Sequence, residues 1–534
     1  MSSKARRTLH VDSGVLQRVG TPSDNWVREG QGWRQVSRQD QRLAGGQGAS
    51  LRQGAVHGAS LGAGALHKAD KHLPDIAALI DPDQFSLITK PNSGVVVLRG
   101  SAGSGKTTVA LHRIAWLAFD GGRGFDPRRV LVIVWGRAMR DYVAHVLPAL
   151  GVEKVQVTTW SDWSRLQVRN HLPGLPKQLS DDTPEPVIRV KLHPGTAKLL
   201  ARKIARRRGP KTWMQAVEDW AETITDRKAL RQALGKDISD AALDRAMRWT
   251  SDQTAAIIRR LEGYDDEDAR LDVEDDALLL RAYQLRVGPL KRQGSRRLSH
   301  AHIVLDEVQD FSPVEVQVLL DTCAKNMSVT LAGDVRQHIS ADAGFSSWQG
   351  FLASIGVEST ALSTLEVSYR STHPIIRFAL DVLDDDDEPL PRTTRDGPPV
   401  ELFRFSDHGA CVAFLAEELR ILFDQEPNAN VALLTPTAEL SATYAEGLSH
   451  SNLQDVRQVI DQEFAFAAGI DVVEASQVKG LEFDYVVIVE ASARYWPDTP
   501  HHRRLLHVAA TRAVHQLWLT SVGTPTSVLP KSSE

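Results

Sequence analysis

The chemistry visible in this sequence begins in a glycine-rich segment that runs from Gly100 to Thr107. The segment reads Gly-Ser-Ala-Gly-Ser-Gly-Lys-Thr and fits the spacing GxxxxGK[ST]. Glycines at these places let backbone N–H groups converge on phosphate oxygens, while Lys106 reaches the terminal phosphates and the Thr107 hydroxyl binds Mg2+. An apolar run at 94–98 predicts a buried strand before the loop, and an amphipathic stretch at 108–119 predicts a helix after it. Because strand, loop and helix come in the required order, the sequence predicts a nucleotide site rather than a connection that binds nothing. The residues expected to hold the nucleotide here are Gly100, Ser101, Ala102, Gly103, Ser104, Gly105, Lys106, Thr107 and Thr108.

A second candidate site residue pair, Asp306 and Glu307, follows the apolar run at 302–305. In open α/β sheets, ligands bind at the carboxyl ends of the strands, which is where these two carboxylates are expected. We expect Asp306 to hold Mg2+, directly or through water, and Glu307 to orient and deprotonate the attacking water. The alternative of a solvated acidic turn fits the run at 384–388 better than it fits carboxylates that end an apolar strand.

The elements that must position these groups alternate along the chain. Strand-like runs rich in β-branched residues are separated, for the most part, by helical stretches, which predicts parallel sheets covered by helices and hence the doubly wound α/β class. The expected strands are 94–98, 130–135, 303–305, 329–332, 400–405, 431–435, 485–489 and 517–520. Residues 164–290 break this pattern with long helical stretches, such as 197–208 and 241–261, and predict a helical insertion.

Composition limits the classes of protein that fit. A chain of 534 residues is too long for one hydrophobic core, so two to four domains are expected. No apolar run approaches the length of a membrane span and the N-terminus lacks an apolar signal region, so we predict a cytoplasmic protein with no membrane partner. Cys323 and Cys411 stand alone and suggest neither a disulfide framework nor a metal site. The net charge of -4 means that nucleic-acid binding would need a local basic groove.

Taken with the two motifs, the order of later segments resembles the UvrD/Rep branch of the superfamily 1 helicases over residues 75–520. In segment 81–85 the resemblance implies that Gln84 reads the adenine edge. In segment 333–337 it implies that Gln337 senses the γ-phosphate. In segment 367–371 it implies that Tyr369 stacks on adenine and that Arg370 contacts the γ-phosphate.

Two segments near the C-terminus extend the same resemblance. In 479–484 it implies that Glu482 bonds the ribose, and in 508–513 that Arg512 is the arginine finger. Arg370 and Arg512 would supply cations that neutralise the charge developing during phosphoryl transfer. The fold class predicted is therefore α/β, with two RecA-like P-loop NTPase lobes and an α-helical insertion in the first lobe. The predicted division is a flexible glycine-rich segment 1–68, a first lobe 69–163 and 291–360, the insertion 164–290, a second lobe 361–525 and a flexible tail 526–534.

The segments that would track a DNA strand match less closely. Residues 135–151 look more like the HelD-type subgroup, whose members include factors that act on RNA polymerase. After Gln337 the family's aromatic run is replaced, so that Phe345 or Trp348 is either a base-stacking platform or a core aromatic. Glu474 and Ser476 stand where the family offers a threonine and a histidine to the strand. The basic clusters at 202–208 and 291–297 are either a backbone-tracking groove or an exposed helix face.

Three functions remain open from the sequence. The leading hypothesis is an ATP-dependent, 3′ to 5′ DNA helicase or single-strand translocase of the UvrD/Rep type in DNA repair or replication, with ATP, Mg2+ and single-stranded DNA as its partners. The alternative is a HelD-like ATPase that remodels or recycles RNA polymerase. The third is a non-catalytic nucleotide-binding protein, which the presence of Lys106, Glu307 and Arg512 disfavours.

Overall fold

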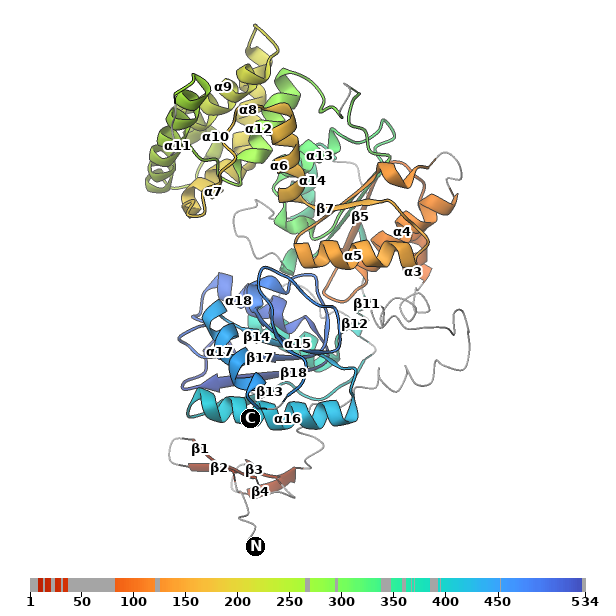
Figure 1. The fold of residues 1–534 in the computed structure, drawn as a ribbon, viewed down its shortest axis with the longest axis vertical. Helices are drawn as coiled ribbons and strands as arrows, with labels where there is room; N and C mark the ends of the chain where they lie inside the picture. The colour runs from red at the N-terminus through yellow and green to blue at the C-terminus, as the bar shows by residue number, and fades with distance from the viewer. Residues whose placement is uncertain are drawn as a thin grey trace. The chain divides into compact units, whose positions relative to one another are not determined.

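Two compact units make up the computed structural model, one formed by Asp70–Arg370 and the other by Met1–Ala69 with Ser371–Glu534 (Figure 1). The residues that the structure describes are 8–12, 15–20, 25–29, 32–36, 82–120, 125–264, 269–292, 296–337, 347–357, 362–365, 367–368, 370–384, 392–393, 395–451 and 453–530. Among these residues, no helix has both the length and the apolar character needed to span a membrane.

A six-stranded parallel sheet organises the first unit. Its strands lie in the order β10 (Leu362–Leu365), β5 (Val95–Gly100), β9 (Val329–Gly333), β8 (His302–Leu305), β6 (Val130–Val134) and β7 (Gln156–Thr159). The four runs predicted in this part of the sequence are all strands. Sequence reasoning missed β7 and β10, because both are short and half polar. Since β10 pairs with β5, this sheet extends beyond residue 360, where the sequence suggested that the first lobe ends.

Successive side chains of these strands face opposite sides of the sheet, and both sides are apolar. On one side, residues such as Leu98 and Val132 pack on α3 (Pro82–Ile88), α4 (Lys106–Asp120) and α5 (Arg137–Ala149). On the other, residues such as Val97 and Ile133 pack in a core that includes α6 (Trp160–His171), α12 (Asp275–Arg286), α13 (Pro313–Leu320) and α14 (Trp348–Ile355). Figure 1 shows the two groups of helices on either side of the strands. The sheet is therefore doubly wound, as predicted.

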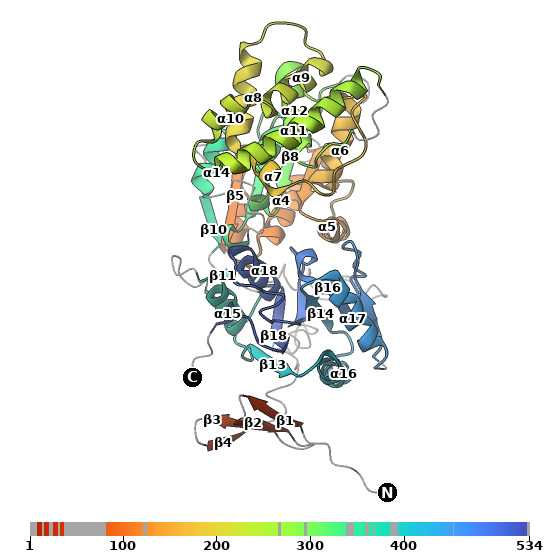
Figure 2. The same ribbon diagram turned by 90° about the vertical axis from the view of Figure 1, so that its left-hand side faces the viewer.

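Between β7 and β8 the chain forms a helical region, gathered at one side of the unit in Figure 2. It contains α7 (Glu185–Leu192), α8 (Pro194–Arg206), α9 (Trp213–Ile224), α10 (Arg227–Leu234) and α11 (Asp240–Leu261). The helical stretches predicted at 197–208 and 241–261 correspond to α8 and α11. A separate apolar cluster, including Val187, Leu199, Leu230 and Leu243, joins α7, α8, α10 and α11.

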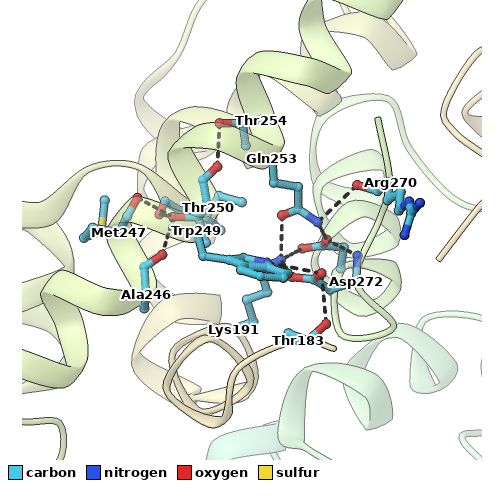
Figure 3. A network of polar contacts seen from close by, with 12 residues as sticks. Thr183, Lys191, Ala246, Met247, Trp249, Thr250, Gln253, Thr254, Arg270 and Asp272 are labelled. Atoms are coloured by element: carbon cyan, nitrogen blue, oxygen red, sulfur yellow. Dashed lines mark hydrogen bonds and ion pairs between the residues drawn. The ribbon is translucent and has the colours of Figure 1, made fainter. Parts of the chain in front are cut away.

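A buried ionic network joins α7 and α11 to the start of α12 (Figure 3). The ammonium of Lys191 lies 2.5 Å from Asp272 Oδ2, 2.6 Å from Asp275 Oδ1 and 2.8 Å from Gln253 Oε1. Trp249 Nε1 donates to Asp272 Oδ2 at 3.0 Å. Lys191, Asp272 and Asp275 are completely buried. We name these five residues the Lys191 network.

The second unit contains another parallel sheet. Its order is β13 (Glu401–Phe405), β18 (Ala513–Val522), β17 (Phe483–Ile488), β14 (Asn430–Thr435), β16 (Gly469–Glu474) and β15 (Val456–Gln458). Helices α16 (His408–Gln425) and α17 (Ala438–Ser449) pack on it through Leu415, Leu419 and Tyr444. Helices α15 (His373–Leu383) and α18 (Pro500–Ala510) pack on each other and on β18. The fold is thus α/β with two RecA-like lobes and a helical insertion in the first, as the sequence predicted.

The two ends of the chain contain structure that the sequence did not predict. Within 1–68, an antiparallel sheet is formed by β1 (Thr8–Asp12), β2 (Val15–Gly20), β3 (Asn25–Glu29) and β4 (Gly32–Val36). The glycine-rich stretch 37–68 lies outside the described residues. In the predicted tail 526–534, Thr526 and Val528 are buried, and Thr526 N donates to Ala491 O at 3.1 Å.

Candidate functional site

The glycine-rich loop turns between the end of β5 at Gly100 and the start of α4 at Lys106. Gly103 and Gly105 have φ values of +74° and +81°, in the left-handed region that favours glycine. A Cβ added at Gly103 would lie 2.5 Å from Arg370 Cβ, and one at Gly105 would lie 3.0 Å from Gln84 Nε2. These two glycines therefore permit both the turn and the close approach of two other candidate site segments.

Lys106 is held over this loop. Its Nζ donates to Gly100 O and Ser101 O, both at 2.9 Å, and the side chain is buried. Burial lowers the pKa of Lys106, and the nearby carboxylates of Asp334 and Glu307 oppose that shift. The ammonium therefore lies at the loop whose backbone N–H groups are expected to bind phosphate oxygens.

Thr107 and Asp306 meet although 199 positions separate them in the sequence: Thr107 Oγ1 donates to Asp306 Oδ2 at 2.7 Å. Burial, followed by the neighbouring charge of Glu307, raises the pKa of Asp306 to about 6. A buried carboxylate beside a second one is stabilised by a cation. Mg2+ is usually held by one or two carboxylates, a substrate phosphate and waters, and a hydroxyl adjoins Asp306 here. The residues at this position therefore fit Mg2+.

Glu307 occupies an unusual backbone conformation directly after β8. Its φ and ψ are 54° and 43°, a left-handed conformation that costs energy for a residue with a side chain. Its N–H donates to Asp306 Oδ1 at 3.0 Å, and its Oε2 accepts from Gln309 Nε2. The sharp turn keeps both carboxylates at the carboxyl edge of the sheet. Gln309 follows Glu307 by two positions but was not singled out in the sequence.

Gln84 reaches the loop from α3. Its Nε2 donates to Ser104 O at 3.1 Å, and the side chain is buried. The C-terminal end of α3 is held by Arg113, whose guanidinium donates to Ile88 O at 3.1 Å, Lys90 O at 2.5 Å and Pro91 O at 2.8 Å. Sequence reasoning missed Arg113. The available signal was an arginine on the apolar face of α4, seven positions after Lys106.

Two further predicted residues come from the ends of neighbouring elements. Gln337, in the turn after β9, is buried and its Nε2 donates to Asp334 Oδ2 at 3.0 Å. Ser368 Oγ donates to Ala102 O at 2.9 Å, which brings the segment that contains Arg370 to the glycine-rich loop. Tyr369 lies outside the described residues. In the first unit, Gln84, Asp306 and Arg370 therefore lie next to the glycine-rich loop.

Arg512 and Glu482 belong to the second unit. Arg512 is buried, and its guanidinium donates to Val508 O at 3.0 Å, Leu481 O at 3.3 Å and Thr511 Oγ1 at 3.1 Å. Glu482 follows Leu481 and is partly exposed. The two C-terminal segments of the family resemblance are therefore in contact with each other through Arg512.

Of the residues considered for DNA contacts, Trp348 is 3% exposed and packs in the core, so the core-aromatic interpretation holds for it. Phe345 lies outside the described residues. Ser476 Oγ donates to Glu474 Oε1 at 2.7 Å. In the basic cluster 202–208, Lys203 pairs with Asp226 at 2.8 Å and Arg207 pairs with Asp219 at 3.0 Å.

Comparisons with known proteins match two parts of the chain to family models. A family model described as an AAA domain matches residues 84–343, and a model of the UvrD-like helicase C-terminal domain matches residues 469–520. The chain is 25% identical over 371 residues to DNA helicase II of Haemophilus influenzae, a match that covers 65% of this chain and 47% of that protein. The chain therefore spans about half the length of this curated relative.

A solved structure, the C-terminal domain of a possible DNA helicase from Lactobacillus plantarum WCFS1, is 23% identical, with a TM-score of 0.26. The match covers 31% of this chain and 96% of the chain in that structure. The comparisons give no support to the alternative in which the partner is RNA polymerase, and the HelD-like subgroup stays a prediction.

Proposed function

Because the chain belongs to the UvrD-like family of superfamily 1 helicases, we propose that it hydrolyses ATP to ADP and phosphate and uses the energy to move along or unwind DNA. The observation that supports this most is the contact of Thr107 with Asp306 beneath the glycine-rich loop. It joins a phosphate cradle to a pair of buried carboxylates, which is the combination that phosphoryl transfer to water requires.

In this proposal the first unit binds the nucleotide and prepares the attacking water. Gln84 recognises adenine from α3, and the loop N–H groups with Lys106 hold the phosphates. Glu307 orients the water and accepts its proton. Gln337 and Arg370 contact the γ-phosphate, where negative charge develops in the transition state. Tyr369 is assigned to adenine stacking and Glu482 to the ribose by the family resemblance.

The bound metal belongs to the same proposal. Thr107 and Asp306 are the residues that would hold Mg2+, which would neutralise phosphate charge during hydrolysis. Arg512 is proposed as the arginine finger, a group that contributes about 10³ to 10⁵ to the rate of phosphoryl transfer in related reactions.

The nucleic-acid part of the proposal comes from the family. UvrD/Rep-type motifs support single-stranded DNA as the track, movement in the 3′ to 5′ direction, and a role in DNA repair or replication. Whether the chain separates a duplex or only moves along one strand is decided by an unwinding assay, separately from hydrolysis.

Steady-state ATPase assays with and without single-stranded DNA test the proposal. We expect DNA to stimulate turnover, Lys106→Ala to abolish it, and Glu307→Gln to bind ATP but lose ~10² to 10⁴ in kcat, the usual contribution of a general base. Matched controls are Lys228→Ala, an exposed lysine on α10 outside both basic clusters, and Glu439→Gln, an exposed carboxylate on α17. Full turnover in Glu307→Gln would show that the base is assigned wrongly. Turnover that DNA leaves unchanged would contradict the DNA-directed part.

A further inference from the structure

Gln309 uses both ends of its side-chain amide inside the candidate site. Its Nε2 donates to Glu307 Oε2 at 2.5 Å, and its Oε1 accepts from Asp334 N at 3.0 Å. The side chain is completely buried. The amide therefore connects the turn after β8, which carries Glu307, with the turn after β9, which carries Asp334.

The end of β9 is shaped to admit this amide. A Cβ added at Gly333 would lie 2.6 Å from Gln309 Oε1 and 2.9 Å from Val308 Cγ1. Real Cβ atoms do not approach other atoms so closely, and both neighbours are packed in a buried turn. Any residue larger than glycine at position 333 would displace Gln309.

Asp334 continues the connection to Gln337. Its Oδ2 accepts from Gln337 Nε2 at 3.0 Å, and its backbone oxygen accepts from Gln337 N at 3.1 Å. A continuous series of hydrogen bonds therefore runs from Glu307 through Gln309 and Asp334 to Gln337. Both ends of the series are residues to which the proposed function gives a role at the γ-phosphate.

The Glu307 carboxylate needs such a partner. Its backbone is in the left-handed conformation, so the side chain leaves the strand at a sharp turn. Gln309 engages Oε2 and thereby restricts the rotation of the carboxylate. A general base must lie within hydrogen-bond reach of the proton that it removes, and a displacement of about 1 Å can cost about 100-fold in rate.

We propose that Gln309 is a positioning residue for ATP hydrolysis, which orients Glu307 and ties its position to the segment that carries Gln337. The inference rests on the proposed function, because it concerns the base of that reaction. Gln309 touches neither nucleotide nor water in this scheme, and it acts through Glu307.

The test compares Gln309→Met, which keeps the length but removes both hydrogen bonds, with Gln309→Glu, which keeps an acceptor for Asp334 N but replaces the donor to Glu307. We expect kcat to fall about 100-fold in both variants, with the Kd for a fluorescent ATP analogue within about twofold of wild type. Gln284→Met is the matched control. Gln284 is also buried, donates to Val318 O in α13 at 2.9 Å and accepts from Arg281 in α12 at 3.2 Å, and neither partner is a candidate site residue.

Two outcomes overturn the inference. One is a kcat in Gln309→Met within about threefold of wild type. The other is a parallel loss of kcat, nucleotide affinity and thermal midpoint that Gln284→Met reproduces, which would indicate a merely structural role. The failure of the proposed function is distinguishable, because it would appear as wild-type turnover in Lys106→Ala and Glu307→Gln, and the inference would then fall with it.

The connection to Gln337 has its own measurement. If the series of hydrogen bonds acts as a unit, Gln309→Met combined with Gln337→Met should lower kcat by far less than the product of the two single effects. Independent, multiplicative effects would refute the connection. Gly333→Ala should also lower kcat, because the added Cβ would displace the Gln309 amide without removing it.

Discussion

Removal of the ammonium at the centre of the Lys191 network should weaken the helical insertion more than any surface ion pair does. Lys191→Met keeps most of the side-chain volume and leaves Asp272 and Asp275 as two buried carboxylates without their cation. Breaking a buried pair in this way costs about 3 to 5 kcal/mol, because the remaining charge is not compensated.

Both carboxylates keep other hydrogen-bond donors in Lys191→Met, so the expected loss of stability lies near the lower end of this range. Asp272 keeps the Trp249 indole and the Thr183 hydroxyl as donors, and Asp275 keeps Gln253 Nε2 at 2.9 Å. These neutral donors stabilise the carboxylates in part. We therefore expect a loss of about 3 kcal/mol, which raises the equilibrium constant for local unfolding by roughly 150-fold.

Hydrogen exchange of peptides from α7, α11 and α12 measures this local unfolding directly. A single global unfolding transition is not assumed, since the chain has several folded parts. Lys203→Met is the matched control: Lys203 lies in the same insertion and pairs with Asp226 at 2.8 Å, but both side chains are partly exposed. Its effect should stay below about 1 kcal/mol.

A double variant tests the physical cause. Burial raises the pKa of Asp275 even though Lys191 opposes the shift, so this carboxylate is costly to keep charged. Lys191→Met combined with Asp275→Asn should recover a large part of the lost protection, because one of the two uncompensated charges is gone. The reasoning is refuted if α7 and α11 are as well protected from hydrogen exchange in Lys191→Met as in Lys203→Met. It is also refuted if adding Asp275→Asn to Lys191→Met makes exchange faster.

Two further predictions concern Arg113 and Asp276. Arg113→Met should release the C-terminal end of α3 and reduce the preference for ATP over GTP by roughly tenfold, measured as the ratio of kcat/KM values, because Gln84 loses its support; an unchanged ratio would contradict that role. Burial raises the pKa of Asp276 to about 7 in the folded protein. Protonation of this carboxyl therefore stabilises the folded state, fully so at a pH below the carboxyl's ordinary pKa, and this contribution is lost as the pH rises through about 7. Between about pH 5 and about pH 8, wild type should therefore lose roughly 2 kcal/mol more than Asp276→Asn in the free energy of local unfolding of α12, measured by hydrogen exchange and corrected for the intrinsic exchange rate at each pH, whereas parallel pH profiles would rule this out.

The local parts of the site were predictable because short-range spacing encodes them. The loop from Gly100 to Thr107 carries its glycines, lysine and threonine in one segment, and its turn depends on the φ values of those glycines. Asp306 and Glu307 follow an apolar run, so their place at the end of a strand was visible from the sequence. Most of the strands predicted correctly are apolar and rich in β-branched residues, whereas β7 and β10 are half polar and depend on their neighbours for pairing.

The tertiary structure alone decided which distant groups meet. Spacing does not reveal that Gln309 spans from Glu307 to Asp334, that Gly333 must be small to admit it, or that Arg113 holds α3. Likewise, the sequence left Trp348 open as a base platform or a core residue, and only packing placed it in the core. The physical reason is that propensity and periodicity act over a few residues, whereas burial, hydrogen-bond partners and charge compensation depend on what the fold brings from elsewhere in the chain.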